Sequence, residues 1–385
     1  MPAVEKPLFR PDAVRPKLPG FALPPAAVAS RPTLAQWSQR LKAGQLDKHK
    51  ETELLPGFLT DVFEGLLGYV RPPTEPYTLK REALVQVDGK FADAALGWFG
   101  GGRNDFAAVL EGKGPRDPLD RPFAGRKKSA VEQALQYAVQ LQIDWYLVTN
   151  LRETRLYHKG HDTLTFERFT TADLAADEGE LKRFVFLLGA ERVLPASGRN
   201  HLDDLLAESK KIGRELTDEY YREYRALREQ TFRALRQHNP DRDPAALLAA
   251  TQKLLDRVLF VAFCEDRHLL PPEIIARAYR HADPFHPRPV WDNFVALFRS
   301  VDAGNPHLNV ERYNGGLFAR DDYLESLAVP DAVCDGFRKL AEYEYGGDAD
   351  TPGKLIDVEI LGHIFEQSIT DLEEQHRALA APSLD

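Results

Sequence analysis

Cysteine and methionine are scarce in this sequence: its 385 residues contain two cysteines and one methionine. Cys264 and Cys334 are too few to build a disulfide framework. The two also lie too far apart in the sequence to suggest a zinc site. We expect both to be buried apolar side chains.

Long apolar segments are also lacking. No run approaches the roughly twenty apolar residues that span a bilayer, and the start, MPAVEKPLFRPD, lacks the apolar stretch of a secretory signal. The sequence therefore predicts no membrane partner and a cytoplasmic location. With 43% hydrophobic residues the chain can bury a large core, and its length allows two or three domains.

The net charge of −9 argues against a protein that coats DNA, because phosphate contacts favour a basic surface. It does not exclude an enzyme that acts on DNA, since the local charge is what a phosphate meets. Residues 103–128 carry seven basic side chains against four acidic ones. The alternative for this stretch is a solvated loop. The side chains expected to contact the DNA backbone are Arg103, Arg116, Arg126, Lys127 and Lys128.

Composition and periodicity divide the chain into three parts. Residues 1–32 hold eight of the 27 prolines and are predicted to form an extended or disordered arm. Residues 33–180 are predicted to form an α/β domain, a mixed sheet flanked by helices, and residues 181–385 an all-α helical domain. The expected elements of the α/β domain are helices over 48–69 and 129–142 and strands over 83–87, 92–99, 106–113, 145–149 and 154–158.

Two of these strands bring three charged residues together. If Gly100–Asn104 is the turn of a hairpin, Asp93 lies opposite Glu111, and strand alternation puts Lys113 on the face of Glu111. Carboxylates are hard oxygen ligands for Mg²⁺, and an ammonium can orient water or stabilise a developing phosphorane charge. The pattern predicts phosphodiester hydrolysis catalysed by Asp93, Glu111 and Lys113. A salt-bridged hairpin surface is the alternative.

The residues Asp93 and Glu111-Gly112-Lys113 resemble the PD-(D/E)XK nuclease motif, with Ala92 in the place of the proline. The expected Mg²⁺ ligands are Asp93, Glu111 and the backbone carbonyl of Gly112.

The resemblance implies two supporting elements. One is an additional metal-binding glutamate on the upstream helix, for which Glu51 is a better candidate than Glu53 because it shares a helical stripe with Leu55. Capping the helix is an equally open role for Glu51. The other is the Q-x-x-x-Y element that follows E-x-K in several branches, matched by Gln133 and Tyr137. Polar positions of an amphipathic helix are the alternative for this pair.

The resemblance extends into the second half. The phrases DRVLFVAFCEDRHLLPP, ERYNGGLF and LGHIFEQSITDLE are similar to the helical connector of type IIG restriction-modification enzymes, in which a nuclease precedes an adenine methyltransferase. We find no glycine-rich S-adenosylmethionine loop and no N-P-P-Y type motif in the sequence. The methyltransferase, its S-adenosylmethionine and a target-recognition region are therefore expected beyond Asp385.

What the resemblance implies is a Mg²⁺-dependent endonuclease module that cuts double-stranded DNA in phage defence. The competing function is a non-catalytic DNA-binding or regulatory part of an adenine-specific DNA methyltransferase.

Overall fold

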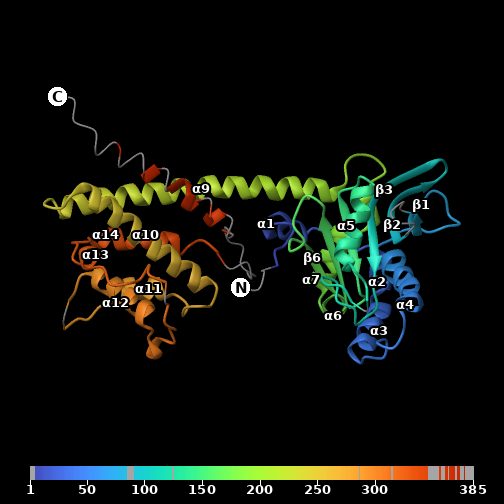
Figure 1. Cartoon of the computed structure of the whole chain (residues 1–385), viewed down its shortest axis with the longest axis horizontal. Helices are drawn as coiled ribbons and strands as arrows, with labels where there is room; N and C mark the ends of the chain where they lie inside the picture. Colours follow the sequence, from blue (N-terminus) through green and yellow to red (C-terminus); the bar gives the residue numbers. More distant parts are fainter. Residues whose placement is uncertain are drawn as a thin grey trace. The chain divides into compact units, whose positions relative to one another are not determined.

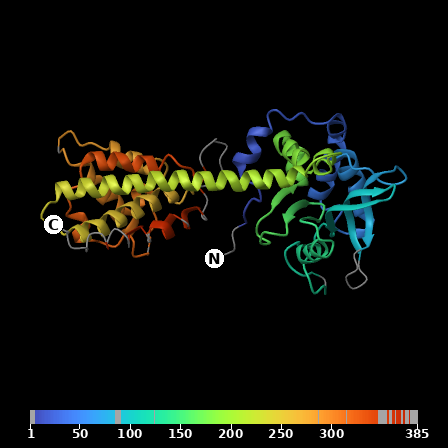
Figure 2. The same cartoon turned by 90° about the horizontal axis from the view of Figure 1, so that it is seen from above.

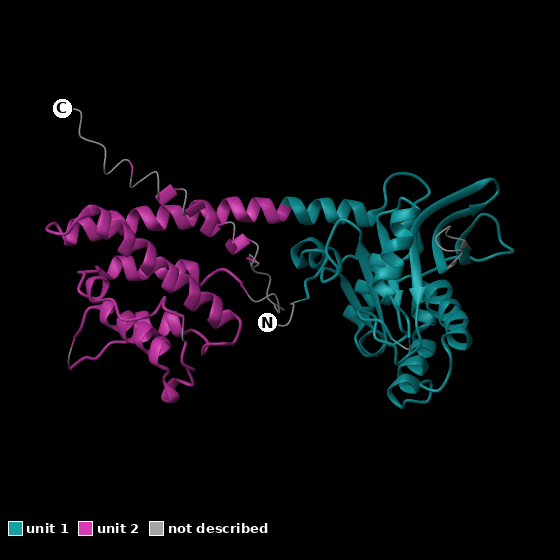
Figure 3. Cartoon of the chain, in the orientation of Figure 1, with its two compact units in different colours: residues 1–211 teal, residues 212–385 magenta. Residues whose placement is uncertain are grey.

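The computed structural model (Figure 1) describes residues 5–84, 91–123, 125–285, 287–313, 315–345, 355–356, 360–362, 364–368, 371–372 and 377. The chain divides into two compact units, residues 1–211 and residues 212–385. The boundary falls within the helix α9 (His201–His238), which is one uninterrupted helix in both views (Figures 1 and 2) and changes colour at the boundary in Figure 3. The predicted domain boundary, at residue 180, is therefore too early in the chain.

A six-stranded sheet forms the centre of unit 1, with the strands in the order β1-β2-β3-β4-β5-β6. The neighbours β3 and β4 are parallel and all others are antiparallel, so the predicted mixed sheet is confirmed. β6 was not predicted, and residues 85–87 of the expected first strand lie outside the described residues. The strands are β1 (Tyr77–Leu84), β2 (Phe91–Gly100), β3 (Arg103–Gly112), β4 (Trp145–Thr149), β5 (Glu153–His158) and β6 (Glu167–Thr170).

The hairpin of β2 and β3 differs from the prediction near its turn. Gly100 pairs with Arg103 and Phe99 with Asn104, so the turn is shorter than the expected Gly100–Asn104. A β-carbon on Gly97 would lie 2.1 Å from the backbone oxygen of Asp105, a distance that only glycine tolerates.

A β-bulge at Gly97 then restores the predicted register further along the hairpin. Beyond the bulge Ala94 pairs with Leu110. Continuing the antiparallel ladder by one residue sets Asp93 beside Glu111, as the sequence predicted.

One face of the sheet is covered by α5 (Ala130–Gln140). The helix begins with a capping box in which the Ser129 side chain accepts a hydrogen bond from the Glu132 backbone and the Glu132 side chain accepts one from the Ser129 backbone. Ala134, Tyr137 and Ala138 are buried against the strands. The predicted helix over 129–142 is confirmed.

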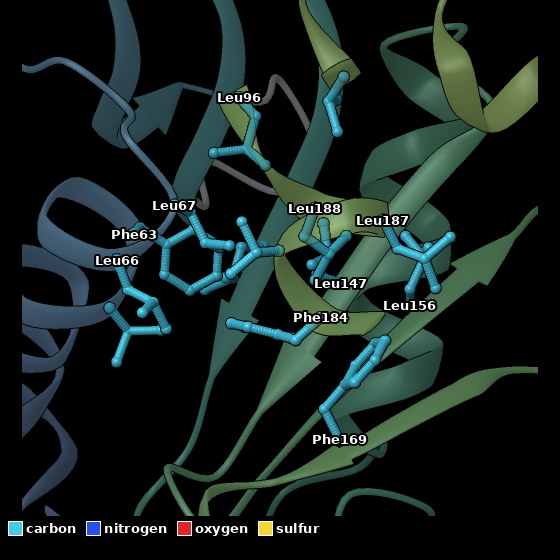
Figure 4. Packing of buried hydrophobic residues seen from close by; sticks show 14 of the residues in the cluster. Phe63, Leu66, Leu67, Leu96, Leu147, Leu156, Phe169, Phe184, Leu187 and Leu188 are labelled. Atoms are coloured by element: carbon cyan, nitrogen blue, oxygen red, sulfur yellow. The ribbon is translucent and has the colours of Figure 1, made fainter. Parts of the chain in front are cut away.

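The other face is covered by helices from both ends of unit 1. In Figure 4, Phe63 packs with Leu96 and Leu147 of the strands and with Phe184 and Leu188. Because residues 178–193 bury their apolar side chains in this core, they belong to unit 1 and not to the second domain as predicted. The helices are α2 (Pro25–Ala29), α3 (Arg31–Lys42), α4 (Glu51–Phe58), η2 (Leu59–Leu66), α6 (Thr171–Ala176), α7 (Glu178–Leu188) and α8 (Ala190–Val193).

The described residues of the proline-rich segment are folded, so the expected extended arm is wrong. They form α1 (Pro11–Val14), η1 (Arg15–Lys17) and α2. Phe9 is 2% exposed and stacks on Trp145 with ring centroids 6.0 Å apart, and its backbone N–H donates to Glu167 at 2.9 Å. Proline interrupts helical periodicity without preventing burial, which is why the pattern gave no signal here.

Unit 2 is built from helices, and in its described residues strand-like pairing is limited to the isolated bridges Asn305–Val310 and Glu344–Leu355. The prediction of an α-helical second half is confirmed for this part. Cys264 and Cys334 are buried and unbonded, as expected. Among the described residues, no helix is both long enough and apolar enough to cross a bilayer. Besides α9, the helices are α10 (Pro244–Asp266), α11 (Ile274–Arg280), α12 (Val290–Ala303), η3 (Pro306–Leu308), α13 (Asp322–Glu325) and α14 (Asp331–Leu340).

Candidate active site

The start of β2 and the end of β3 meet at Asp93 and Gly112. The carboxylate of Asp93 accepts a hydrogen bond from the backbone N–H of Gly112 at 2.7 Å. In an extended strand the N–H and C=O of one residue point to the same side. The Gly112 carbonyl therefore also faces the Asp93 side, where the sequence analysis expects a metal ligand.

Glu111 and Lys113 form a buried ion pair next to this contact. Their side chains are 6% and 5% exposed, and the Lys113 ammonium donates to Oε1 of Glu111. The other oxygen, Oε2 of Glu111, is buried and has no hydrogen-bond partner. A buried carboxylate oxygen without a partner costs free energy, so this position suits an additional cation.

Strand alternation places the three charged residues on one face. Val109 and Ala95 pack under α5. Glu111 and Lys113 follow Val109 by two and four residues, and Asp93 precedes Ala95 by two. Because side chains alternate along a strand, all three charged residues lie on the face of α5. The structure thus brings together the three residues that the sequence predicted to converge.

The carboxyl groups at this position hold protons more tightly than usual. Burial, together with the nearby Asp93 charge, raises the pKa of Glu111 to about 7, although Lys113 opposes the shift. Burial also raises the pKa of Asp93, opposed by the Gly112 hydrogen bond and by Lys113. The metal-free site is therefore short of positive charge.

Glu51 is the first residue of α4 and faces the same group. Burial raises its pKa, Lys113 lowers it and Asp93 raises it, so its carboxylate interacts with both. Glu53, by contrast, is exposed and accepts a hydrogen bond from the Lys50 backbone at 2.8 Å, which caps the helix. Of the two glutamates, Glu51 is the one whose charge interacts with the candidate site.

Tyr137 and Gln133 occupy one side of α5 but have different surroundings. Tyr137 is buried, and burial followed by the charges of Glu111 and Asp93 raises its pKa to about 12, so its hydroxyl stays protonated beside the carboxylates. The amide of Gln133 donates to the backbone oxygen of Lys128 at 3.1 Å, at the start of the helix. In this structure, Gln133 orders the helix start and Tyr137 borders the site.

The expected DNA contacts separate into two groups. Arg116, Arg126, Lys127 and Lys128 are exposed on the segment between β3 and α5. Arg103 lies at the other end of β3, eight residues or about 27 Å from Glu111, where it pairs with an acid of its own strand. Arg103 is therefore not part of the basic segment beside the site, contrary to its grouping in the sequence analysis.

One acidic residue beside the site was missed. Asp117 lies in the basic segment and forms an ion pair with Arg126 at 3.1 Å. Its position four residues after Lys113 could have identified it. The net positive charge of residues 103–128 conceals this single acid.

The residues available to hold a metal are few. In the part of the chain that the structure describes, no three or more His, Cys, Asp or Glu side chains are gathered as a metal-binding cluster. An ion at this position would be held by Asp93, Glu111 and the Gly112 carbonyl, with Glu51 acting through water. The partnerless Oε2 of Glu111 is the feature that fits such an ion.

No protein-family model matches the sequence, and no curated protein matches it significantly. Among solved structures, the chain is similar to the cryo-EM structure of a DrdV–DNA complex, with 16% sequence identity and a TM-score of 0.26. The match covers 91% of this chain and 29% of that chain, so this chain spans less than a third of that protein's length. A similarity this distant assigns neither a family nor an activity.

Proposed function

We propose that unit 1 is a divalent-metal-dependent endonuclease that hydrolyses phosphodiester bonds of double-stranded DNA. The observation that carries the proposal is the convergence of Asp93, Glu111 and Lys113 on one face of the sheet, with a buried oxygen of Glu111 lacking a partner. Oxygen ligands for a divalent ion beside a positive charge suit metal-assisted hydrolysis of a phosphodiester.

Each residue has a distinct role in this proposal. Asp93, Glu111 and the Gly112 carbonyl hold Mg²⁺, which when bound polarises the scissile phosphate and lowers the pKa of its water. Lys113 places a positive charge where the transition state gains negative charge. Glu51 acts on the ion through water, and the protonated Tyr137 hydroxyl borders the two carboxylates.

Backbone contacts come from the exposed segment between β3 and α5. Arg116, Lys127 and Lys128 are exposed beside the site, where they can meet the phosphates flanking the scissile bond.

A cleavage assay with plasmid DNA tests the proposal. The purified chain should cut the plasmid with Mg²⁺ or Mn²⁺ and not with EDTA. Asp93→Asn, which keeps the side chain's shape but removes its charge, should abolish cutting, whereas Asp105→Asn at the far end of the hairpin should cut normally. Equal cutting by wild type and Asp93→Asn would reject the proposal.

The second candidate is a non-catalytic DNA-binding module. The observation in its favour is that Lys113 already neutralises Glu111 without a metal. It predicts DNA binding by the wild type with no cleavage in any divalent metal.

The wider context is proposed from the resemblance of the second half to type IIG connectors. In that context the module belongs to a cytoplasmic restriction-modification protein of phage defence, covalently linked to a target-recognition region and an adenine-specific methyltransferase that uses S-adenosylmethionine.

A further inference from the structure

A pocket of about 360 Å³ opens beside the candidate site. One wall is the start of α4 and the residues before it, and the other is the segment that follows β3. Basic and acidic side chains are equal in number among its charged groups, and His49 adds an imidazole. The charged lining residues are Lys50, Arg116 and Arg126 against Asp47, Glu51 and Asp117.

Arg126 joins the two walls of this pocket. One nitrogen of its guanidinium lies 3.5 Å from the Glu51 carboxylate and another lies 3.1 Å from the Asp117 carboxylate. The charge of the same carboxylate interacts with those of Asp93 and Lys113. The charge that Glu51 would offer to a metal ion is therefore partly neutralised by Arg126.

The three partners differ in how firmly they are held. The backbone oxygen of Asp117 accepts a hydrogen bond from Asn150 at 3.0 Å, and that of Pro115 accepts one from Arg152 at 2.9 Å. These bonds anchor the pocket wall that follows β3 to the loop between β4 and β5. The Arg126 side chain is 37% exposed, against 20% for Glu51 and 17% for Asp117. Arg126 is thus the member that a ligand from solvent reaches first.

We infer that Arg126 is a positioning residue that couples DNA binding to metal binding, an inference that rests on the proposed function. Without DNA its guanidinium holds Glu51. A backbone phosphate entering the pocket offers Arg126 a charge-assisted, two-armed contact that competes with the two carboxylates. When Arg126 turns to the phosphate, Glu51 is released for the ion, so the site gains metal affinity once DNA is in place.

The first test measures Mn²⁺ binding to the whole chain without DNA, by the loss of the free-ion paramagnetic resonance signal. Arg126→Gln should tighten Mn²⁺ binding about two- to fivefold, the range expected for removing a partly exposed ion pair. Arg126→Lys retains the charge but cannot make a bidentate contact, so it should tighten Mn²⁺ binding by a smaller factor. Lys127→Gln removes the same charge from the next residue and should have no such effect.

The Glu51→Gln background decides whether the effect passes through Glu51. There Arg126→Gln should raise Mn²⁺ affinity much less, because only its electrostatic interaction with Asp93 remains. A gain of the same size in this background, or no gain in the wild-type background, overturns the inference.

The second test adds a mixed-sequence DNA duplex with phosphorothioate linkages. The duplex should tighten Mn²⁺ binding to the wild type and have less effect on Arg126→Gln. Equal effects on both proteins contradict the coupling.

Failure of this inference differs from failure of the proposed function. If Asp93→Asn abolishes Mn²⁺ binding while Arg126→Gln leaves it unchanged, only the coupling is wrong. If Mn²⁺ binding does not depend on Asp93, the metal site itself is wrong.

Discussion

The Asp93 carboxylate and the Gly112 backbone N–H are joined by a hydrogen bond of 2.7 Å. This contact places the first carboxylate of β2 at the end of β3, next to the buried ion pair of Glu111 and Lys113. Two acids and one ammonium therefore share one position, which leaves one negative charge uncompensated when both acids are ionised. The predictions below follow from that imbalance and from the packing that maintains it.

Replacing Lys113 should separate binding from chemistry. Lys113→Ala should lower the DNA cleavage rate about a hundredfold or more, as expected for loss of one preorganised charge at the transition state. Mn²⁺ and DNA binding should persist, because the carboxylates and the basic segment are intact. Single-turnover cleavage and filter binding measure the two quantities, with Lys182→Ala on α7, outside the basic segment, as the control. A cleavage rate equal to wild type would show that Lys113 has no catalytic role.

Metal binding should weaken as the pH falls through about 7. Burial and Asp93 raise the pKa of Glu111 to about 7, and the pKa of Asp93 is raised as well, so below that pH protons compete with the ion for the same oxygens. Mn²⁺ titrations on either side of pH 7 measure the effect. The exposed Glu53 serves as the control, because Glu53→Gln should leave the pH dependence unchanged. Affinity that stays constant across this range contradicts the prediction.

The same pKa shifts set the sign of a stability change. The folded chain binds the Glu111 proton more tightly than the unfolded chain does, so this group's contribution to the stability of the metal-free protein is lost as the pH rises through about 7. Thermal unfolding in EDTA should show a Tm that decreases as the pH rises from the ordinary glutamate pKa of 4.5 to about 7. Glu111→Gln should make this dependence of Tm on pH less steep.

Gly112 should be intolerant of a side chain because of Leu55. A β-carbon there would lie 2.5 Å from Cδ2 of Leu55, which is buried one turn after Glu51 on α4. Gly112→Ala should cost about 1–3 kcal/mol of the free energy of unfolding, the usual result of overpacking, and should displace Glu51. In the Leu55→Ala background, Gly112→Ala should cost less free energy of unfolding than it does in the wild type, as measured by urea denaturation.

A matched control tests that explanation. A β-carbon on Gly114, two residues away, would meet its nearest atom at an ordinary 3.7 Å, so Gly114→Ala should leave the stability near wild type. If Gly112→Ala were equally harmless, the close approach of α4 to β3 would be wrong.

The amino-terminal segment should be essential to the stability of unit 1. Phe9→Ala removes a ring that is 2% exposed and stacked on Trp145, and should cost about 3–5 kcal/mol. Val28→Ala in the same segment, where the side chain is 47% exposed, should change the free energy of unfolding by about 0.5 kcal/mol or less. Equal stability of the two variants would restore the interpretation of a dispensable arm.

The sequence predicted the candidate site better than its surroundings. Period-two alternation and one turn were enough to bring Asp93 to Glu111, because the single bulge at Gly97 cancels the error at the turn. The ion pair between Glu51 and Arg126 was not predictable, because it joins residues 75 positions apart whose contact depends on tertiary packing.

The predicted domain boundary was wrong for a different reason. Helical periodicity begins before residue 201, and periodicity alone cannot tell whether a helix packs on the sheet or on other helices. Phe184 and Leu187 are completely buried in the core of unit 1, so α7 belongs with the strands despite its helical pattern.

The most direct test of the central claim is to locate the metal. Crystals of the wild-type chain grown with Mn²⁺ should show an anomalous-scattering peak within coordination distance of Asp93, Glu111 and the Gly112 carbonyl, with the Lys113 ammonium moved off Glu111. The same experiment with Asp93→Asn should show no peak there. A wild-type crystal with Mn²⁺ bound elsewhere, and the Lys113–Glu111 ion pair intact, would contradict the account.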